Sequence, residues 1–334
     1  MKRLFIIITL LSIQIMSSQS YSGIDSTVAT YPKKFKSIEQ FANRIEHDFE
    51  TDIEKTRAAY FWIANHITYD YKTFRKNKKN KKIRSKSKAD YEAKLQIYNR
   101  KLAQKTLRKR SAVCEGYSRL LTEVLKDLNI ISVVVTGYAK TYVQEIGRKR
   151  NNSNHAWNAV KLDNKWYLID VTWSTGNSIY NSEFFNFSDT YFMIDPDNLI
   201  LTHFPDDEQW QLLEKPISKI DYFNFPIFYS AYHTSELKLN TKTNGYITTK
   251  TDSVIQLDFS SINKAKTYYY SYDNSGHSGT LKFKYQNGNF TTLIPYKDKR
   301  RRNLVISDGQ LALMKFKIKL ITPQSLTKTT VFTP

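Results

Sequence analysis

Hydrophobic side chains in the first two thirds of the chain recur mostly at helical spacing. Between Cys114 and Leu128 they return every three or four residues, which predicts a helix with one buried face and Ser111 as its N-cap. Ser37–Gln40 and Thr51–Glu54 fit the capping-box pattern and predict two earlier helix starts. We expect Trp62, in the second of these helices, to lie in the core. Residues 21–36 show no periodicity and are predicted to be irregular.

Two runs around residue 163 predict a β-hairpin. His155–Leu162 is followed by the turn residues Asp163-Asn164 and by the return run Lys165–Trp173. If Leu162 pairs with Lys165, His155 and Asp170 lie on one face of the hairpin as diagonal neighbours, within reach of a hydrogen bond. The β-branched run Ile130–Val135 predicts a further strand beside the helix.

Past Pro216 the pattern changes to short strands separated by Asn-Gly and Asp-Gly turns. This change predicts an all-β, immunoglobulin-like sandwich over residues 216–334, after a mixed domain over residues 21–215. The expected strands are 236–239, 246–249, 254–259, 267–272, 281–285, 290–294, 304–306 and 313–321.

The first twenty residues read as a signal peptide. Lys2 and Arg3 precede the apolar run Leu4–Ile15, and small polar residues follow it. The run is short for a membrane span, which needs ~20 residues. We therefore expect export, to the periplasm or beyond the cell, with an uncleaved N-terminal anchor as the alternative. The apolar run is not followed by a cysteine, which excludes lipid attachment there.

The net charge of +20 is concentrated in one basic insertion, residues 72–110. It holds 17 lysines and arginines and only two acids, so most of the excess positive charge lies there. Its first half, to about residue 88, almost entirely lacks apolar residues and is predicted to be mobile, whereas residues 89–107 have helical spacing. Such a segment suits an anionic polymer of the cell envelope, or it is simply a solvated loop. The sequence has no nucleic-acid-binding motif or phosphate-binding glycine loop, so no specific nucleic-acid partner is expected.

The only cysteine, Cys114, falls in the first turn of the predicted central helix. Helix N-termini stabilise anions, and the thiolate form of cysteine is the nucleophile. Gly116 allows another segment or a substrate to approach the sulfur. The alternative is that Cys114 is a small buried hydrophobic residue. The predicted hairpin favours a catalytic role for Cys114, because Asp170 can orient His155 so that the free nitrogen of the imidazole takes the thiol proton.

Three segments resemble the motif blocks of the transglutaminase-like superfamily: Val113–Tyr117, His155–Asn158 and Trp166–Trp173. More narrowly, they are similar to the branch that includes the kyphoscoliosis peptidase and secreted bacterial relatives. Tyr191-Phe192 and His203–Pro205 resemble an extension of that branch, so the likeness covers approximately residues 37–215. It implies an α+β, papain-like core with a site helix packed on an antiparallel sheet, and a catalytic Cys114, His155 and Asp170.

Other residues are secondary candidates. Tyr69 is a candidate oxyanion donor beside the backbone N–H of Cys114. Trp157 and Trp173, with Gly116, are candidates for the substrate cleft. His203 is either a second imidazole near the site or, as its place in the resembling extension favours, a structural residue. We expect no metal and no cofactor, because the histidines are scattered and the chain offers no second cysteine.

These observations predict an exported, monomeric enzyme that attacks protein or peptide amides through a thioester. Hydrolysis is favoured over cross-linking to an amine, because the resembling branch is named for a peptidase. A non-catalytic scaffold protein of the cell envelope is the alternative from another class.

Overall fold

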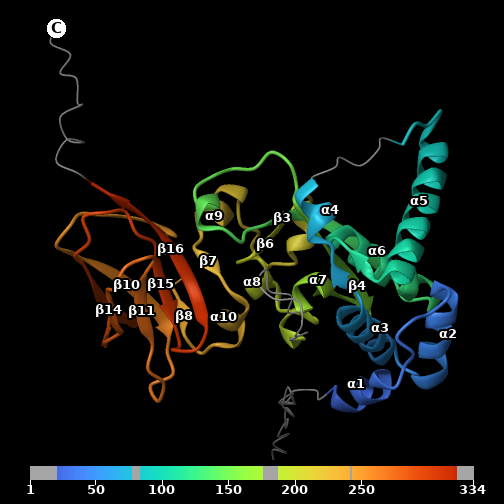
Figure 1. The fold of residues 1–334 in the computed structure, drawn as a ribbon, viewed down its shortest axis with the longest axis horizontal. Coiled ribbons are helices and arrows are strands. Elements are labelled where there is room, and N and C mark those ends of the chain that lie inside the picture. The colour runs from blue at the N-terminus through green and yellow to red at the C-terminus, as the bar shows by residue number, and fades with distance from the viewer. Residues whose placement is uncertain (1–20, 77–82, 176–186, 241–242, 322–334) are drawn as a thin grey trace, which may run out of the picture.

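The computed structural model describes residues 21–76, 83–175, 187–240 and 243–321. A part of mixed helices and strands and an all-β part lie at opposite ends of the long axis (Figure 1). The predicted signal peptide, residues 1–20, lies outside the described residues. Among the helices that are described, none combines the length and the apolar character needed to cross a bilayer.

Three helices open the mixed part: α1 (Ser22–Ala29), α2 (Ile38–Asp48) and α3 (Asp52–His66). Ser37 caps α2, and a complete capping box begins α3, so both predicted helix starts are confirmed. The prediction of irregular structure before residue 36 is wrong, because α1 lies there. Its Asp25 forms a 2.5 Å ion pair with the buried Arg57 of α3, a tertiary contact that local spacing does not reveal.

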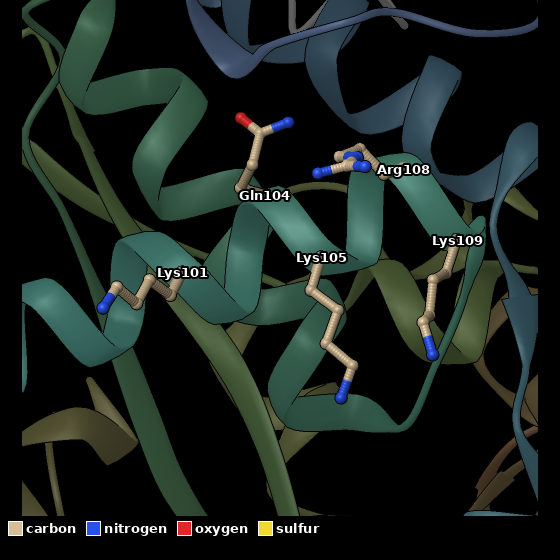
Figure 2. A pocket seen from close by; sticks show the side chains of 5 residues that line it. All are labelled: Lys101, Gln104, Lys105, Arg108 and Lys109. Atoms are coloured by element: carbon tan, nitrogen blue, oxygen red, sulfur yellow. The ribbon is translucent and has the colours of Figure 1, made fainter.

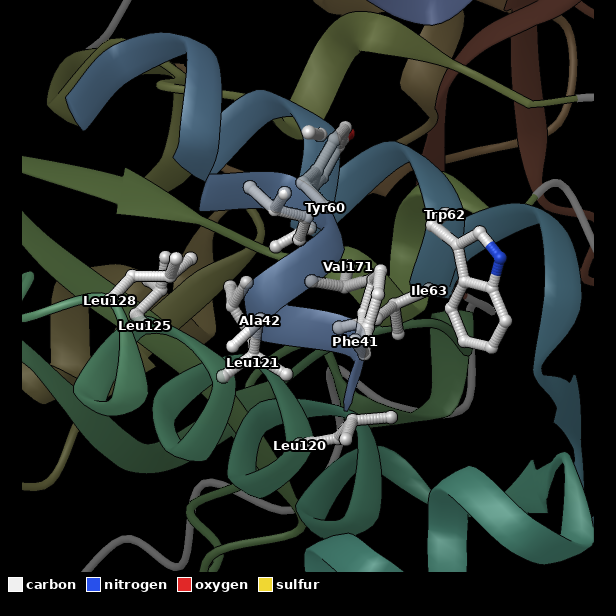
Figure 3. Close-up of a cluster of buried hydrophobic side chains, with 14 of the residues drawn as sticks. Phe41, Ala42, Tyr60, Trp62, Ile63, Leu120, Leu121, Leu125, Leu128 and Val171 are labelled. Atoms are coloured by element: carbon white, nitrogen blue, oxygen red, sulfur yellow. The ribbon is translucent and has the colours of Figure 1, made fainter. Parts of the chain in front are cut away.

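Helix α6 (Cys114–Asp127) lies at the centre of the mixed part and begins at the cysteine, as predicted. Its leucines face side chains of α2 and α3, including Phe41 and Ile63 (Figure 3). Its N-cap is Val113 rather than Ser111. Ser111–Ala112 instead forms strand β2, which pairs in parallel with β1 (Thr68–Tyr69), so Ser111 is not at the helix end.

A four-stranded antiparallel sheet packs against α6. Its order is β5-β4-β3-β6, made of β3 (Ser132–Ala139), β4 (His155–Leu162), β5 (Lys165–Ile169) and β6 (His203–Pro205). The predicted hairpin register is right, because Leu162 lies opposite Lys165. Strand β5 is shorter than predicted, since Asp170 caps the short helix α7 (Val171–Ser174) and ends the strand.

The basic insertion contributes α4 (Tyr71–Lys76) and α5 (Lys88–Lys109). The predicted helix in its second half is confirmed, and α5 packs against α6. Residues 77–82, part of the half predicted to be mobile, lie outside the described residues. The remaining short elements of the mixed part are η1 (Val143–Glu145), η2 (Asp189–Tyr191), α8 (Pro196–Leu199), η3 (Glu208–Gln211) and α9 (Lys219–Asn224).

The all-β part is a sandwich of two sheets that share one apolar core. One sheet has the order β13-β14-β10-β8, and the other has the order β12-β11-β15-β16-β7, with β9 added in parallel to β16. The predicted fold class, an α+β core followed by an all-β region, is confirmed; the immunoglobulin-like topology stays a prediction. The elements are β7 (Ile227–Phe228), α10 (Ser230–Thr234), β8 (Lys238–Leu239), β9 (Tyr246–Thr249), β10 (Ser253–Ser261), β11 (Tyr269–Tyr272), β12 (Ser278–Thr280), β13 (Phe283–Gln286), β14 (Asn289–Tyr296), β15 (Leu304–Ser307) and β16 (Ala312–Leu320).

The two parts of the molecule are in direct contact. The buried side chain of Lys140 donates from Nζ to the backbone oxygens of Tyr222 (2.5 Å) and Phe225 (2.9 Å), which fixes α9, the last helix of the mixed part before the all-β part. Ile227 of β7 is buried against Val143 and Ile146 of the mixed part. These contacts lie close to the predicted domain limit at residue 215.

Candidate active site

Side-chain hydrogen bonds tie the site helix α6 to strand β4. Ser118 Oγ donates to the backbone oxygen of Ala156 (2.9 Å). The buried Asn158 amide donates to the backbone oxygen of Ser118 (3.0 Å) and to Oγ1 of Thr122 (2.9 Å). Because buried polar groups are costly to leave unpaired, these bonds fix the helix against the strand. They thereby set the distance between the first residue of α6 and the first residue of β4, which are Cys114 and His155.

The structure brings Cys114, His155 and Asp170 together in that order. His155 Nε2 lies 2.5 Å from Oδ2 of Asp170. The partly exposed thiol of Cys114 is a hydrogen-bond partner of the same imidazole. Since Nε2 is occupied by Asp170, Nδ1 is the ring nitrogen that remains for the sulfur. This is the arrangement of nucleophile, base and orienting carboxylate that thiol catalysis requires.

Charge is stabilised on both members of the buried His155–Asp170 pair. Burial disfavours the charged form of each. That cost is outweighed by the short hydrogen bond and the attraction between them, so the pKa of His155 is raised and the pKa of Asp170 is lowered. The hydrogen bond to Cys114 further favours the imidazolium. At neutral pH the site therefore holds a carboxylate next to a protonated imidazole.

A second imidazole completes the buried cluster. His203 Nε2 lies 3.0 Å from Oδ2 of Asp170, the oxygen that also accepts from His155. The sequence pattern is compatible with two roles for His203 and does not reveal this bond. Strand β6 pairs with β3, which places His203 opposite Ala139. These two strands are far apart in the sequence, so no local sequence pattern predicts their pairing.

His155, Asp170 and His203 offer three potential metal-ligand atoms within 4.8 Å of one another. Two imidazoles and a carboxylate suit a divalent transition metal. In this structure, however, both Nε2 atoms are directed at one carboxylate oxygen. A cation bound there would replace the hydrogen bond that orients His155, so metal binding and the triad arrangement exclude each other.

Tyr69 lies beside the start of α6, because β1 pairs with the strand that leads into the helix. Burial raises the pKa of its phenol, and the nearby Cys114 adds to this rise. The hydroxyl thus stays protonated and able to donate a hydrogen bond, as an oxyanion donor must.

The three cleft candidates occupy different environments. Gly116 is buried, and a Cβ there would lie 2.6 Å from Cβ of Ala112 and 2.7 Å from Oγ1 of Thr106. The absence of a side chain at Gly116 therefore allows α5 to pack closely on α6. The segment that approaches this glycine is part of the same chain and is not a substrate. Trp157 is only 1 % exposed and packs behind the imidazoles of the site, so it offers substrate no surface. Trp173 is half-buried, with its ring 5.9 Å from that of His155, and remains a candidate.

The part of the chain that holds these residues is similar to known proteins. Residues 39–171 match the family model described as the transglutaminase-like superfamily. The kyphoscoliosis peptidases of human and mouse are each 29 % identical to the chain over 204 residues, which is 60 % of this chain and 27 % of theirs. Hillarin of Drosophila melanogaster is 27 % identical over 132 residues, which is 35 % of this chain and 16 % of hillarin. The chain thus spans about a quarter of the length of the first two relatives.

Among solved structures, one described as a TGase is similar to the chain. It is 19 % identical, with a TM-score of 0.28, and the match covers 55 % of this chain and 40 % of that one.

Proposed function

Because residues 39–171 form a domain of the transglutaminase-like superfamily, whose members are cysteine peptidases or acyltransferases, we propose that the protein is an exported thiol enzyme that cleaves protein or peptide amides. The observation that carries the proposal is the chain of contacts from Cys114 through His155 to the buried Asp170.

The proposed reaction begins with attack by the Cys114 sulfur, as a thiolate, on an amide carbonyl carbon. The carbonyl oxygen becomes an oxyanion, for which the backbone N–H of Cys114 and the phenol of Tyr69 are the candidate donors. The imidazolium of His155 gives its proton to the leaving amine, the C–N bond breaks and a thioester forms. His155 then takes a proton from water, whose oxygen displaces the sulfur and releases a carboxylic acid.

The acceptor of the acyl group separates the two enzymatic alternatives. Water gives a peptidase or amidase, whereas a lysine amine gives a cross-link. Hydrolysis is supported by the similarity to proteins named as peptidases, over the 60 % of this chain that they match.

Two assays on the purified protein test the proposal, each with wild type and Cys114→Ala. One measures new amino termini released from unfolded casein, and the other measures incorporation of a fluorescent primary amine into the same substrate. We expect new termini with wild type alone. Amine incorporation that depends on Cys114 would favour the cross-linking alternative, and equal signals from both proteins would refute a thiol mechanism.

The proposal of export is supported by the basic start and the apolar run of residues 2–15. Fusing residues 1–25 to a phosphatase that is active only outside the cytoplasm tests it. Activity should appear with the natural sequence and be lost when two leucines of the run are replaced by arginine.

A further inference from the structure

Asp170 is held by donors on both of its carboxylate oxygens. Oδ1 accepts from the backbone N–H of Trp173 at 3.1 Å. Oδ2 faces two imidazoles, His155 at 2.5 Å and His203 at 3.0 Å, and Asp170 itself is fully buried. Only one of these imidazoles contacts the nucleophile, so the second has no part in proton transfer to substrate.

The protons around His203 can be assigned from its partners. Its Nδ1 lies 2.7 Å from Oγ1 of Thr202, and that hydroxyl is also 3.1 Å from the backbone oxygen of Leu199. A hydroxyl has one proton to donate. If Thr202 donated this proton to Leu199, Nδ1 of His203 would have to be protonated in order to bond to the hydroxyl. Nε2 would then either direct a lone pair at the carboxylate, which is repulsive, or be protonated as well, which would place a positive charge on the buried ring.

Donation from Thr202 to Nδ1 removes this conflict. His203 is then neutral and its Nε2–H donates to Asp170. Both ring nitrogens of His203 thus have a hydrogen-bond partner. The oxygen of Leu199 loses nothing essential, because it already accepts the backbone N–H of Thr202 at 3.0 Å. The assignment agrees with the surroundings of His203, whose side chain has no exposed surface.

The electrostatic surroundings also favour a neutral ring. Burial and the charge on His155 lower the pKa of His203 to about 4, although the hydrogen bond to Asp170 opposes this change. The other titratable groups that face the ring are Tyr191 and His233, and burial raises the pKa of the first and lowers that of the second. Both are therefore neutral near pH 7, which leaves Asp170 and His155 as the charges that act on His203.

We propose that His203 is a positioning residue of the site: a neutral imidazole whose tautomer is set by Thr202 and whose Nε2–H holds Asp170 with Oδ2 directed at His155. It acts on Cys114 only through the carboxylate and the first imidazole. The inference rests on the proposed function, since it assigns a role within the same triad.

The tautomer is tested directly by ¹⁵N NMR of histidine-labelled protein, with the His203 signals assigned from their loss in His203→Gln. We expect a protonated Nε2 and an unprotonated Nδ1 from pH 5 to pH 9, and a change at Nδ1 in Thr202→Val but not in Thr202→Ser. A proton on Nδ1 in the wild type, or titration of His203 within this range, would overturn the assignment.

The positioning role is tested by the pH dependence of Cys114 alkylation with iodoacetamide, which needs no substrate. His203→Phe removes the donor and should lower the alkylation rate at pH 6 by roughly tenfold, the loss expected for one hydrogen bond to a charged group. His203→Gln keeps an N–H near the position of Nε2 and should recover most of the rate. Circular dichroism identifies any variant that has not folded, and Thr202→Val then replaces His203→Phe as the test.

His155→Ala distinguishes failure of this inference from failure of the proposed function. If that variant loses alkylation at acid pH but His203→Phe matches the wild type, His203 has no positioning role and the triad stands. If His155→Ala also matches the wild type, both the triad and the role of His203 are refuted.

Discussion

At the scale of single residues, the Asp170 side chain has two roles. It caps α7 through Oδ1 and orients His155 through Oδ2. The same carboxylate therefore ends strand β5 and holds the base, which explains why the predicted return strand stops at this position. The residue pattern predicted the contact with His155, because the hairpin register depends only on the turn and the alternation of side chains.

The His155–Asp170 pair should make stability depend on pH. The pKa of Asp170 is lowered in the folded protein, so its contribution is complete above its ordinary pKa of ~4 and is lost as the pH falls below that. The pKa of His155 is raised, so its contribution is complete below its ordinary pKa of ~6.5 and is lost as the pH rises toward the folded-state value. Both contributions are complete between about pH 4 and pH 6.5.

Asp170→Asn should lower the free energy of unfolding most within that window, by about 3 kcal/mol, because it leaves a buried imidazole without its counter-charge. Urea unfolding at a series of pH values measures the loss. The exposed Asp197→Asn is the matched control and should leave the profile unchanged. An equal loss from Asp170→Asn at every pH would argue against the charged pair.

At the scale of elements, the packing of α5 on α6 connects the basic insertion to the site. Sequence spacing predicted both helices, but not that they cross at Gly116, where an added Cβ would lie only 2.6 Å from Ala112 and 2.7 Å from Thr106. Gly116 lies two residues after Cys114 in the first turn of α6. A displacement of α5 at this contact would therefore also change the position of Cys114.

Gly116→Ala should force α5 and β2 away from the first turn of α6, at a cost of roughly 1–3 kcal/mol for overpacking. We expect both a lower denaturation midpoint and slower alkylation of Cys114. Gly23→Ala is the matched control, since its added methyl group would meet no atom within 4 Å. If both alanine variants behave alike, the close approach at Gly116 has no bearing on the site.

One face of α5 carries an unbalanced positive charge. Lys101, Lys105 and Lys109 project on the same side of the helix, beside Arg108 (Figure 2). Within the described part of the chain, none of these four cations has an acidic partner, whereas Arg100 is paired with Asp127 at 2.7 Å. The sequence left open whether the insertion binds an anionic polymer of the cell envelope or is a solvated loop, and on the ground of this row we propose that it binds such a polymer.

Heparin serves as the probe polymer for that proposal. Replacing the three lysines with glutamate should weaken its binding by roughly a factor of ten at low ionic strength, with a smaller difference at high salt. The same triple change at the exposed Lys266, Lys284 and Lys299 of the all-β part is the control for net charge. Equal weakening by both triple changes would show general charge attraction and no binding face on α5.

At the scale of the whole molecule, the all-β part supports the wall of the site. The ring of Tyr191 packs against Trp173, and its hydroxyl oxygen lies 3.1 Å from Oγ of Ser230 at the start of α10. Lys317 of β16 donates to the backbone oxygen of Ile146 at 3.1 Å. These contacts predict that the two parts unfold together.

Ile227→Ala tests this coupling, because Ile227 is 1 % exposed and buried against the mixed part. It should cost about 2–4 kcal/mol and move a single calorimetric transition to lower temperature. Ile220→Ala, at a side chain that is 51 % exposed, should leave the transition in place. Two separate transitions, of which only one moves, would contradict the coupling.

The sequence alone determined the parts of this protein that depend on local spacing. The helix that begins at Cys114, the hairpin register that brings His155 within reach of Asp170, and the change to short strands past Pro216 all follow from the periodicity of side chains and from turn residues, which act over a few positions. Tertiary structure alone decided the other contacts. His203 reaches Asp170, α5 meets Gly116, and Trp157 is buried behind the site because segments far apart in the chain pack together, and local spacing carries no record of which surfaces will meet.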